Sequence, residues 1–276
     1  NNAKNIKKSL GKNVLLCAMV KANAYGHGLK NVCKFLNGTA DFFGVANVTE
    51  AKMIRDENIK TPIVVVGIPA IKHINWCAEN NVSVTIASLK QFNSILKVLG
   101  NKKLKVHIKI NTGLNRIGFK SLKSVEKLVT QINACSNVKL EGVFTHFATK
   151  AADVDFLNLQ AETFNKYCNA IKSLSKEKCI IIHCCNSYAT LNVPNCHFNM
   201  VRCGFALYGY QQEYSVKLTE SLRITSQIVF VEKIKAGDTV GYDRTFKADK
   251  PMKIAVVPLG YADGMDRRLS NNFEVL

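Results

Sequence analysis

Short apolar runs alternate with amphipathic segments through most of the chain. The runs cover residues 14–21, 43–47, 63–67, 82–87, 105–111, 142–146, 179–184 and 199–206. Between several of them, apolar positions recur with helical spacing, at residues 49–58, 88–99, 121–134 and 155–173. Strands that are apolar throughout and joined by helices are typical of a parallel sheet covered on both faces. Eight such runs match a closed (β/α)8 barrel of the TIM type, which we predict for residues 1–213.

Polar residues directly after two of these runs suggest where helices begin. Thr49 and Ser88 each follow a predicted strand, at the position where an N-cap residue belongs. We therefore expect these two side chains to cap the helices that follow.

The pattern changes after Tyr210. Residues 222–231 alternate in part and are rich in β-branched side chains, residues 235–238 are typical of a turn, and residues 240–246 and 253–258 again resemble strands without a helix between them. We predict a separate antiparallel β domain over residues 214–276. The chain starts without Met and ends in a strand-like run, so we expect this domain to be truncated and the natural protein to continue beyond both ends.

Composition excludes several classes of protein. The 276 residues are 47% hydrophobic, yet no run reaches the roughly 18 to 20 apolar residues that span a bilayer, and no signal peptide is evident. The net charge of +18 comes from lysines scattered over amphipathic segments. We interpret them as a solvated surface that attracts anions such as phosphate, and we predict no nucleic-acid or membrane partner.

The ten cysteines show no Cys-x-x-Cys spacing. Most fall singly in apolar stretches, where cysteine behaves as a small buried hydrophobe. Adjacent residues on a strand point to opposite faces, so His183, Cys184 and Cys185 cannot chelate a metal together. We predict no metal site, and reduced thiols in a cytoplasmic protein. The single cysteines expected to be buried are Cys17, Cys33, Cys77, Cys135, Cys168 and Cys179.

Charged and hydrogen-bonding residues follow the predicted strands at their carboxyl ends, where barrels of this type carry their active sites. They are Lys21, Asn111 with Arg116, His146, Asn186 with Ser187, and Arg202 with Gly204. Lys21 opens a tight loop of small residues, Lys-Ala-Asn-Ala-Tyr-Gly-His-Gly at 21–28. Partial burial would lower the pKa of its amine and suit it to Schiff-base chemistry.

This loop resembles the signature around the pyridoxal-phosphate (PLP) lysine of the alanine racemase family. Further segments resemble that family in the same order, at residues 109–119, 142–148, 183–187, 201–209, 240–246 and 258–264. The resemblance implies a PLP-dependent isomerase that interconverts L- and D-alanine with two bases and supplies D-alanine for peptidoglycan. It also implies a homodimer with shared active sites.

The resemblance assigns the two bases. Lys21 would hold PLP and serve as the base for the D-enantiomer, while Tyr242 would serve the L-enantiomer from the partner subunit's barrel. Two bases are needed because the proton leaves one face of the α-carbon and returns to the other. A phenol is a poor base unless cations stabilise its phenolate form. His146 and Arg202 are the candidates for that network.

The resemblance also assigns the cofactor contacts. Arg202 would lie against the pyridine nitrogen and keep it unprotonated, which would limit transamination, and His183 would orient Arg202. The PLP phosphate would be held by Tyr25, the Ser187 hydroxyl and the backbone N–H groups of Gly204 and Phe205.

Three further positions follow from the same resemblance. Arg116 would contact the phenolic oxygen of PLP and the substrate carboxylate. Lys109 matches a lysine that is often carbamylated in the family, which would provide an anion to hold that arginine. Asn111 stands where the family usually has Asp, so the charge balance around Lys109 is open.

Other functions stay open at this point. A serine racemase of the same family has the same motifs. A PLP carrier protein is a single barrel without the β domain that contains Tyr242. A PLP decarboxylase should show a different lysine loop and a cysteine-aspartate motif. An inactive remnant is the fourth reading.

Overall fold

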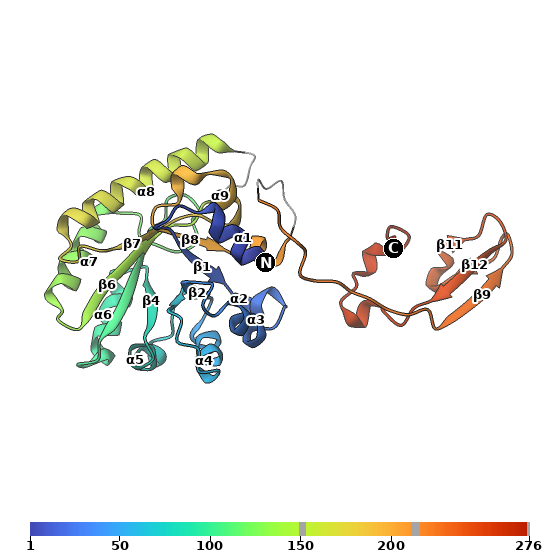
Figure 1. Ribbon diagram of the computed structural model, residues 1–276, viewed down its shortest axis with the longest axis horizontal. Coiled ribbons are helices and arrows are strands. Elements are labelled where there is room, and N and C mark those ends of the chain that lie inside the picture. Colours follow the sequence, from blue (N-terminus) through green and yellow to red (C-terminus); the bar gives the residue numbers. More distant parts are fainter. Residues whose placement is uncertain (149–152, 211–215, 275–276) are drawn as a thin grey trace. The chain divides into compact units, whose positions relative to one another are not determined.

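The computed structural model describes residues 1–148, 153–210 and 216–274 (Figure 1). The chain forms two compact units, Asn1–Leu222 and Arg223–Leu276. The boundary that we predicted between residues 213 and 214 lies outside the described residues. None of the helices in the described ranges is long and apolar enough to cross a membrane.

The first unit is an eight-stranded parallel barrel, as predicted. Strands lie in the order β7-β6-β5-β4-β3-β2-β1-β8. The two ends of the sheet meet where the Asn199 N–H donates to the Ile182 carbonyl (3.4 Å) and the Arg202 N–H to the Cys185 carbonyl (3.2 Å). The strands are β1 (Leu15–Met19), β2 (Phe42–Val45), β3 (Ile63–Val65), β4 (Val82–Ile86), β5 (Leu104–Lys109), β6 (Val138–Phe144), β7 (Ile181–His183) and β8 (Met200–Cys203).

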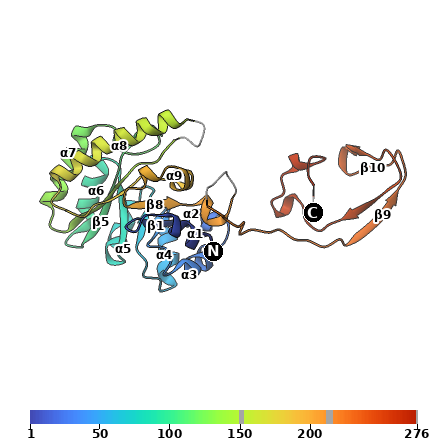
Figure 2. The same cartoon turned by 45° about the horizontal axis from the view of Figure 1, so that its top comes forward.

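Helices cover the outside of the barrel (Figures 1 and 2). In α6, for example, Phe92, Ile95 and Leu99 recur at helical spacing and are buried. The α-helices of this unit are α1 (Asn2–Ser9), α3 (Leu29–Leu36), α4 (Val48–Asp56), α5 (Ile74–Glu79), α6 (Leu89–Leu99), α7 (Leu122–Ala134), α8 (Val154–Leu174) and α9 (Ser187–Asn192). The segment α2 (Lys21–Tyr25) is a short turn of left-handed backbone.

One of the two predicted helix caps is wrong. Ser88 caps α6 as predicted, accepting a hydrogen bond from the Gln91 N–H at 3.1 Å. In α4 the cap is Asn47, whose Oδ1 accepts from the Glu50 N–H at 3.0 Å, and Thr49 lies inside the first turn. Strand β2 ends at Val45, and the N-cap lies two residues earlier than predicted.

The barrel interior holds an unusual number of polar side chains. Ser83, Thr85, His107, Lys109, Thr145, His183 and Arg202 are all buried. Such groups are costly to bury unless they find partners, so their presence in an otherwise apolar barrel points to function. Two cysteine predictions are wrong: Cys179, in the segment before β7, is exposed, and Cys135, just after α7, is only half-buried.

The second unit contains two antiparallel strand pairs, which confirms its β character. Strand β9 (Phe230–Ile234) pairs with β12 (Met252–Val256), and β10 (Thr239–Val240) pairs with β11 (Phe246–Lys247). The predicted turn is present, since the Lys235 N–H donates to Asp238 at 2.7 Å.

Two strand predictions in this unit need correction. Residues 222–229 form no strand, although all of them are described. The predicted strand at 240–246 is interrupted by a 3-10 turn, Tyr242–Arg244, where Gly241, Asp243 and Arg244 adopt positive φ angles. Positive φ breaks the alternation of a strand, so β-rich composition alone was misleading here.

Candidate active site

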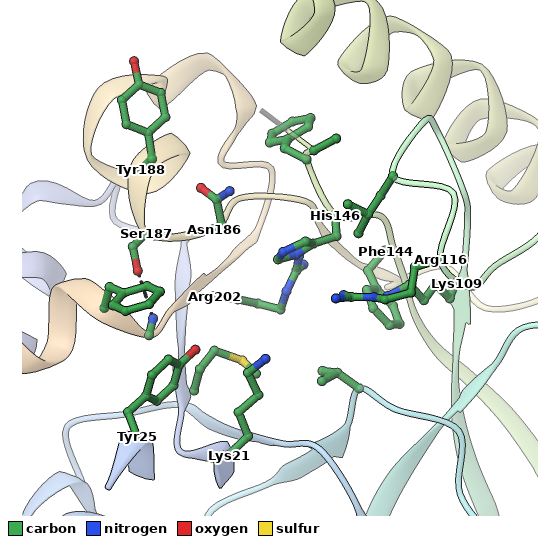
Figure 3. A pocket seen from close by; sticks show the side chains of 17 residues that line it. Lys21, Tyr25, Lys109, Arg116, Phe144, His146, Asn186, Ser187, Tyr188 and Arg202 are labelled. Carbon is green, nitrogen blue, oxygen red and sulfur yellow. Dashed lines mark hydrogen bonds between the residues drawn. The ribbon is translucent and has the colours of Figure 1, made fainter. Parts of the chain in front are cut away.

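A cavity of about 350 Å³ opens at the carboxyl ends of the barrel strands. Figure 3 shows the amine of Lys21 and the guanidinium groups of Arg116 and Arg202 directed into it. The structure brings together ten of the barrel residues that we singled out, whereas Asn111 and His183 do not line the cavity: Lys21, Tyr25, Lys109, Arg116, His146, Asn186, Ser187, Arg202, Gly204 and Phe205. Tyr242 belongs to the second unit, where its side chain is 88% exposed.

Lys21 begins a turn of left-handed backbone. The four residues that follow it, 22–25, have φ angles between +53° and +55°. This conformation costs roughly 1–2 kcal/mol per residue for side chains other than glycine, so the turn must be held from outside. Glu50 holds it: its carboxylate accepts from the Ala22 N–H at 2.6 Å and from the Ala46 N–H at 2.7 Å. Glu50 was not among the site residues predicted from the sequence.

The surroundings of Lys21 favour its neutral amine. Burial lowers the pKa of Lys21, the positive charge of Arg116 lowers it further, and Arg202 adds a smaller effect. The carboxylate of Glu50 opposes this shift. A neutral amine is the form that attacks a carbonyl carbon and accepts a proton.

Arg202 is buried, and no carboxylate of the described residues is in direct contact with it. Its guanidinium donates to the carbonyls of His183 (3.0 Å), Thr145 (2.8 Å) and Cys184 (3.1 Å). It also contacts the ring nitrogens Nδ1 of His183 at 2.8 Å and Nδ1 of His146 at 3.2 Å. These five contacts fix the orientation of the guanidinium. The contact with His183 agrees with the prediction that His183 orients Arg202.

His146 is held as a neutral ring. Burial, followed by the charges of Arg202, Lys109, Arg116 and Lys21, lowers the pKa of His146 to about 3. Because arginine only donates, Nδ1 of His146 must accept, and the ring hydrogen is then on Nε2.

Lys109 is the most perturbed lysine of the cavity. Burial, together with the charges of Arg202, Arg116 and Lys21, lowers its pKa to about 7. Its ammonium lies over the ring of Phe144, 4.9 Å from the centroid, and Arg202 lies over the same ring at 5.4 Å. The face of an aromatic ring attracts cations, which lets these two groups share the site.

The cavity is strongly cationic. It is lined by Lys21, Lys109, Arg116 and Arg202, and there is no Asp or Glu among its described lining residues. Such a site attracts anions, including phosphate and carboxylate groups. The lining residues that the sequence analysis did not single out are Met19, Val66, Leu114, Phe144, Phe147, Ala148 and Tyr188.

Ser187, Gly204 and Tyr25 form a small cradle on one side of the cavity. The Ser187 hydroxyl oxygen accepts from the N–H groups of Gly204 (3.0 Å) and Ala206 (3.2 Å). We expected the Gly204 N–H to face a phosphate; here it is bonded to Ser187, which keeps its own hydrogen to donate. A Cβ atom at Gly204 would overlap the Tyr25 hydroxyl, so only glycine lets that hydroxyl approach. The cradle fits a phosphate group.

Asn111 has a local structural role. Its side-chain oxygen accepts from the N–H groups of Gly113 (3.2 Å) and Asn115 (3.0 Å). These bonds shape the loop that brings Arg116, an exposed residue, to the cavity. An amide oxygen serves this purpose as well as a carboxylate, but it adds no negative charge near Lys109.

Family models agree with this geometry. Residues 1–212 match the model "Alanine racemase, N-terminal domain", and residues 221–276 match "Alanine racemase, C-terminal domain". The chain belongs to the alanine racemase family. The resemblance stated from the sequence is therefore confirmed, and with it the dependence of the family on PLP.

Relatives of known name or structure extend the match over the whole chain. It is 39% identical to "Alanine racemase 1" of Caldanaerobacter subterraneus subsp. tengcongensis, covering 100% of this chain and 73% of that protein. It is similar to the crystal structure of the Bacillus anthracis alanine racemase with bound L-Ala-P. The two are 32% identical with a TM-score of 0.88, and the match covers 98% of this chain and 72% of that one. The structure of the histidine racemase of Leuconostoc mesenteroides subsp. sake is also similar. The two are 27% identical with a TM-score of 0.80, and the match covers 95% of this chain and 72% of that one.

The cavity fits PLP on its own chemistry. It offers a lysine with a lowered pKa, a cradle with the Ser187 and Tyr25 hydroxyls for a phosphate, and a buried arginine. These features lie around one cavity, so a single ligand can reach all of them.

Proposed function

We propose that this protein is a PLP-dependent racemase that interconverts L- and D-alanine. The observation that carries the proposal is the single cavity in which the Lys21 amine, the Ser187 cradle and the Arg202 guanidinium meet. Bound PLP supplies an electron sink for the negative charge that develops at the α-carbon of the substrate. The protein provides the groups that bind, orient and move protons.

In this proposal, Lys21 holds the cofactor through its amine nitrogen and also takes the α-proton of D-alanine at Nζ. Tyr242 takes the α-proton of L-alanine at its phenolic oxygen, from the partner subunit of a homodimer. The two groups must work on opposite faces of the carbon, because inversion needs removal on one side and delivery on the other. His146, a neutral ring with its hydrogen on Nε2, would donate to the phenolate form of Tyr242.

The two arginines have separate roles. Arg116 binds the substrate carboxylate at the open side of the cavity. Arg202 would hold the ring-nitrogen side of the cofactor, where its permanent positive charge would keep that nitrogen unprotonated and suppress amino-group transfer. Phe205 would add its N–H to the phosphate cradle.

Lys109 is suited to carbamylation by CO2, which needs a neutral amine. Burial keeps a large share of this lysine neutral near pH 7. A carbamate there would add the negative charge that the cavity lining lacks, next to Arg116. Carbon-13 NMR with labelled CO2 would detect it as a resonance that is absent from Lys109→Met.

The proposal includes a cellular role. The thiols of the chain are free and most are buried, which suits the reducing cytoplasm. There the enzyme would supply D-alanine for peptidoglycan.

Substrate preference is the test of this function. We expect the purified full-length protein, loaded with PLP, to racemise L-alanine with a kcat/KM at least about tenfold above that for L-serine or L-histidine, since extra polar atoms must be desolvated in the cavity. A chiral separation of the products measures all three. A preference for serine would favour the serine racemase alternative, and PLP binding without any racemisation would favour a carrier.

Gly204→Ala should weaken cofactor binding. The new methyl group would displace the Tyr25 hydroxyl from the phosphate cradle. Loss of one hydrogen bond to a charged group corresponds to about 1.5–3 kcal/mol, or a roughly 10- to 100-fold rise in the Kd for PLP. Absorbance titration of the apoprotein measures this Kd. Gly11→Ala serves as a control for glycine replacement, because Gly11 is exposed, has no positive φ and a Cβ atom there would make only an ordinary contact of 3.6 Å. An unchanged Kd for Gly204→Ala would show that the Tyr25 hydroxyl does not help to bind the cofactor.

Burial of Lys109 should make stability depend on pH. Its pKa is about 7 in the fold against an ordinary 10.5, so between these values the unfolded chain binds more protons than the native one. The free energy of unfolding should therefore rise with pH above 7, by up to about 1 kcal/mol per pH unit from this group. Urea unfolding of CO2-free apoprotein at pH 7 and pH 8.5 measures it. Between these two pH values the free energy of unfolding should rise less in Lys109→Met than in the wild type. An equal rise in both proteins would contradict the prediction.

A further inference from the structure

A buried chain of side chains runs from Arg202 across the barrel interior. Nδ1 of His183 lies 2.8 Å from Nη1 of Arg202, and Nε2 of His183 lies 2.9 Å from Nδ1 of His107. Nε2 of His107 in turn lies 3.0 Å from Oε2 of Glu141. Both histidines are fully buried, and neither lines the cavity.

The positions of the hydrogens along this chain follow from the chemistry of its ends. Arginine only donates, so Nδ1 of His183 must accept and the hydrogen of that ring is on Nε2. This hydrogen can bond only to an unprotonated Nδ1 of His107, which places the hydrogen of His107 on Nε2. The last bond then runs from His107 to the carboxylate of Glu141. In each of these hydrogen bonds the donor is therefore on the side of the Arg202 cation, and the acceptor is on the side of the Glu141 anion.

The far end of the chain is built to keep Glu141 ionised. Besides His107, its carboxylate contacts the Ser83 hydroxyl and, at 3.2 Å, the ammonium of Lys105. Although burial opposes ionisation, these donors hold the pKa of Glu141 at about 2.

The surrounding barrel makes room for the two rings. A Cβ atom at Gly142 would overlap the ring of His107, so β6 accommodates that ring only with glycine. The pairing of β5 with β6 shifts register between Val106 and His107. The ring of Phe144 stacks on His183, with centroids 4.9 Å apart and an angle of 11° between the planes.

We propose that Glu141, acting through His107 and His183, is a positioning residue for Arg202. A carboxylate in direct contact would neutralise the arginine and weaken its effect on a ligand in the cavity. A carboxylate two imidazoles away compensates the buried charge and fixes the acceptor that Arg202 needs, while the guanidinium keeps its positive charge toward the cavity. This inference rests on the proposed role of Arg202 beside the cofactor's ring nitrogen.

The first test needs no racemase activity. Protein labelled with nitrogen-15 in histidine, without cofactor, would be studied by NMR, and the resonances would be assigned with His107→Gln. Both His107 and His183 should carry a hydrogen on Nε2 and none on Nδ1. A hydrogen on Nδ1 of either ring would contradict the proposed order of hydrogen bonds from Arg202 to Glu141.

The second test uses the PLP-loaded enzyme and the variant Glu141→Gln, which keeps an acceptor oxygen but removes the charge. We expect kcat for alanine to fall about tenfold with KM changed less than about twofold. The ratio of pyruvate formed to alanine racemised should rise, because a looser Arg202 suppresses amino-group transfer less well. Glu162→Gln, the same substitution at an exposed residue of α8 that does not line the cavity, is the matched control and should keep the wild-type ratio.

The outcomes separate the inference from the proposed function. An unchanged ratio in Glu141→Gln, or an equal change in Glu162→Gln, would mean that Glu141 is not a positioning residue for Arg202. A wild-type protein that does not racemise alanine would refute the proposed function, and the NMR measurement would still decide whether the hydrogens run from Arg202 to Glu141.

Discussion

Lys21→Arg is expected to lose racemisation by at least about 10³-fold, the upper part of the range for losing one general base. Arginine keeps the positive charge of the site, yet it stays protonated at any pH the protein tolerates. It can therefore neither accept the α-proton nor attack the aldehyde carbon of PLP. A chiral assay of alanine measures the loss. Borohydride treatment followed by mass spectrometry should find reduced cofactor on the peptide of Lys21 in the wild type and on no peptide in the variant.

Lys97→Arg is the matched control for this substitution. Lys97 lies on the exposed face of α6 and does not line the cavity, so its replacement should leave turnover unchanged. Retention of more than about a tenth of the wild-type rate in Lys21→Arg would contradict both roles of the lysine.

Tyr242→Phe should lower racemisation about 10²- to 10⁴-fold, since it removes one of the two proposed bases. The two enantiomers have equal free energies in an achiral solvent, so kcat/KM must fall equally in both directions. The direction-specific effect lies in hydrogen exchange. In heavy water, the variant should still exchange the α-hydrogen of D-alanine through Lys21, while exchange from L-alanine is lost.

Proton NMR of each enantiomer measures both exchange rates. Continued exchange from D-alanine would also show that the variant is folded and loaded with cofactor. If exchange from L-alanine survives at the wild-type rate, another group takes that proton and Tyr242 loses its role.

Much of the barrel and its site could be predicted from the sequence. Parallel strands in a barrel are buried on both faces, so they stand out as apolar runs, and the residues at their carboxyl ends must meet at one rim. That reasoning located Lys21, His146 and Arg202, which line one cavity in the structure.

Features that depend on contacts between residues far apart in the sequence could not be predicted. Residues 22–25 adopt a left-handed turn although none is glycine, because Glu50 clamps the turn from another part of the chain. His107 and Glu141 also escaped notice: each is one polar residue in or beside a strand, and only the folded barrel shows that they form a chain to Arg202. A polar residue at an inward-facing strand position was the available signal.

The strands of the second unit were harder to predict from the sequence. Its strand pairs are short and exposed, so the alternation of apolar and polar residues is weak, and the turn at Tyr242–Arg244 depends on positive φ angles in Asp243 and Arg244. The role of Tyr242 comes from the family resemblance and stays a prediction.

Incubating L-alanine with the PLP-loaded full-length enzyme in heavy water, and stopping the reaction early, tests whether two bases work on opposite faces of one carbon. We expect D-alanine that carries deuterium at the α-carbon, because its proton comes from a second group that exchanges with the solvent. D-alanine that keeps the protium of the substrate at the earliest times would show that one group carries the proton from face to face, and would contradict the two-base mechanism.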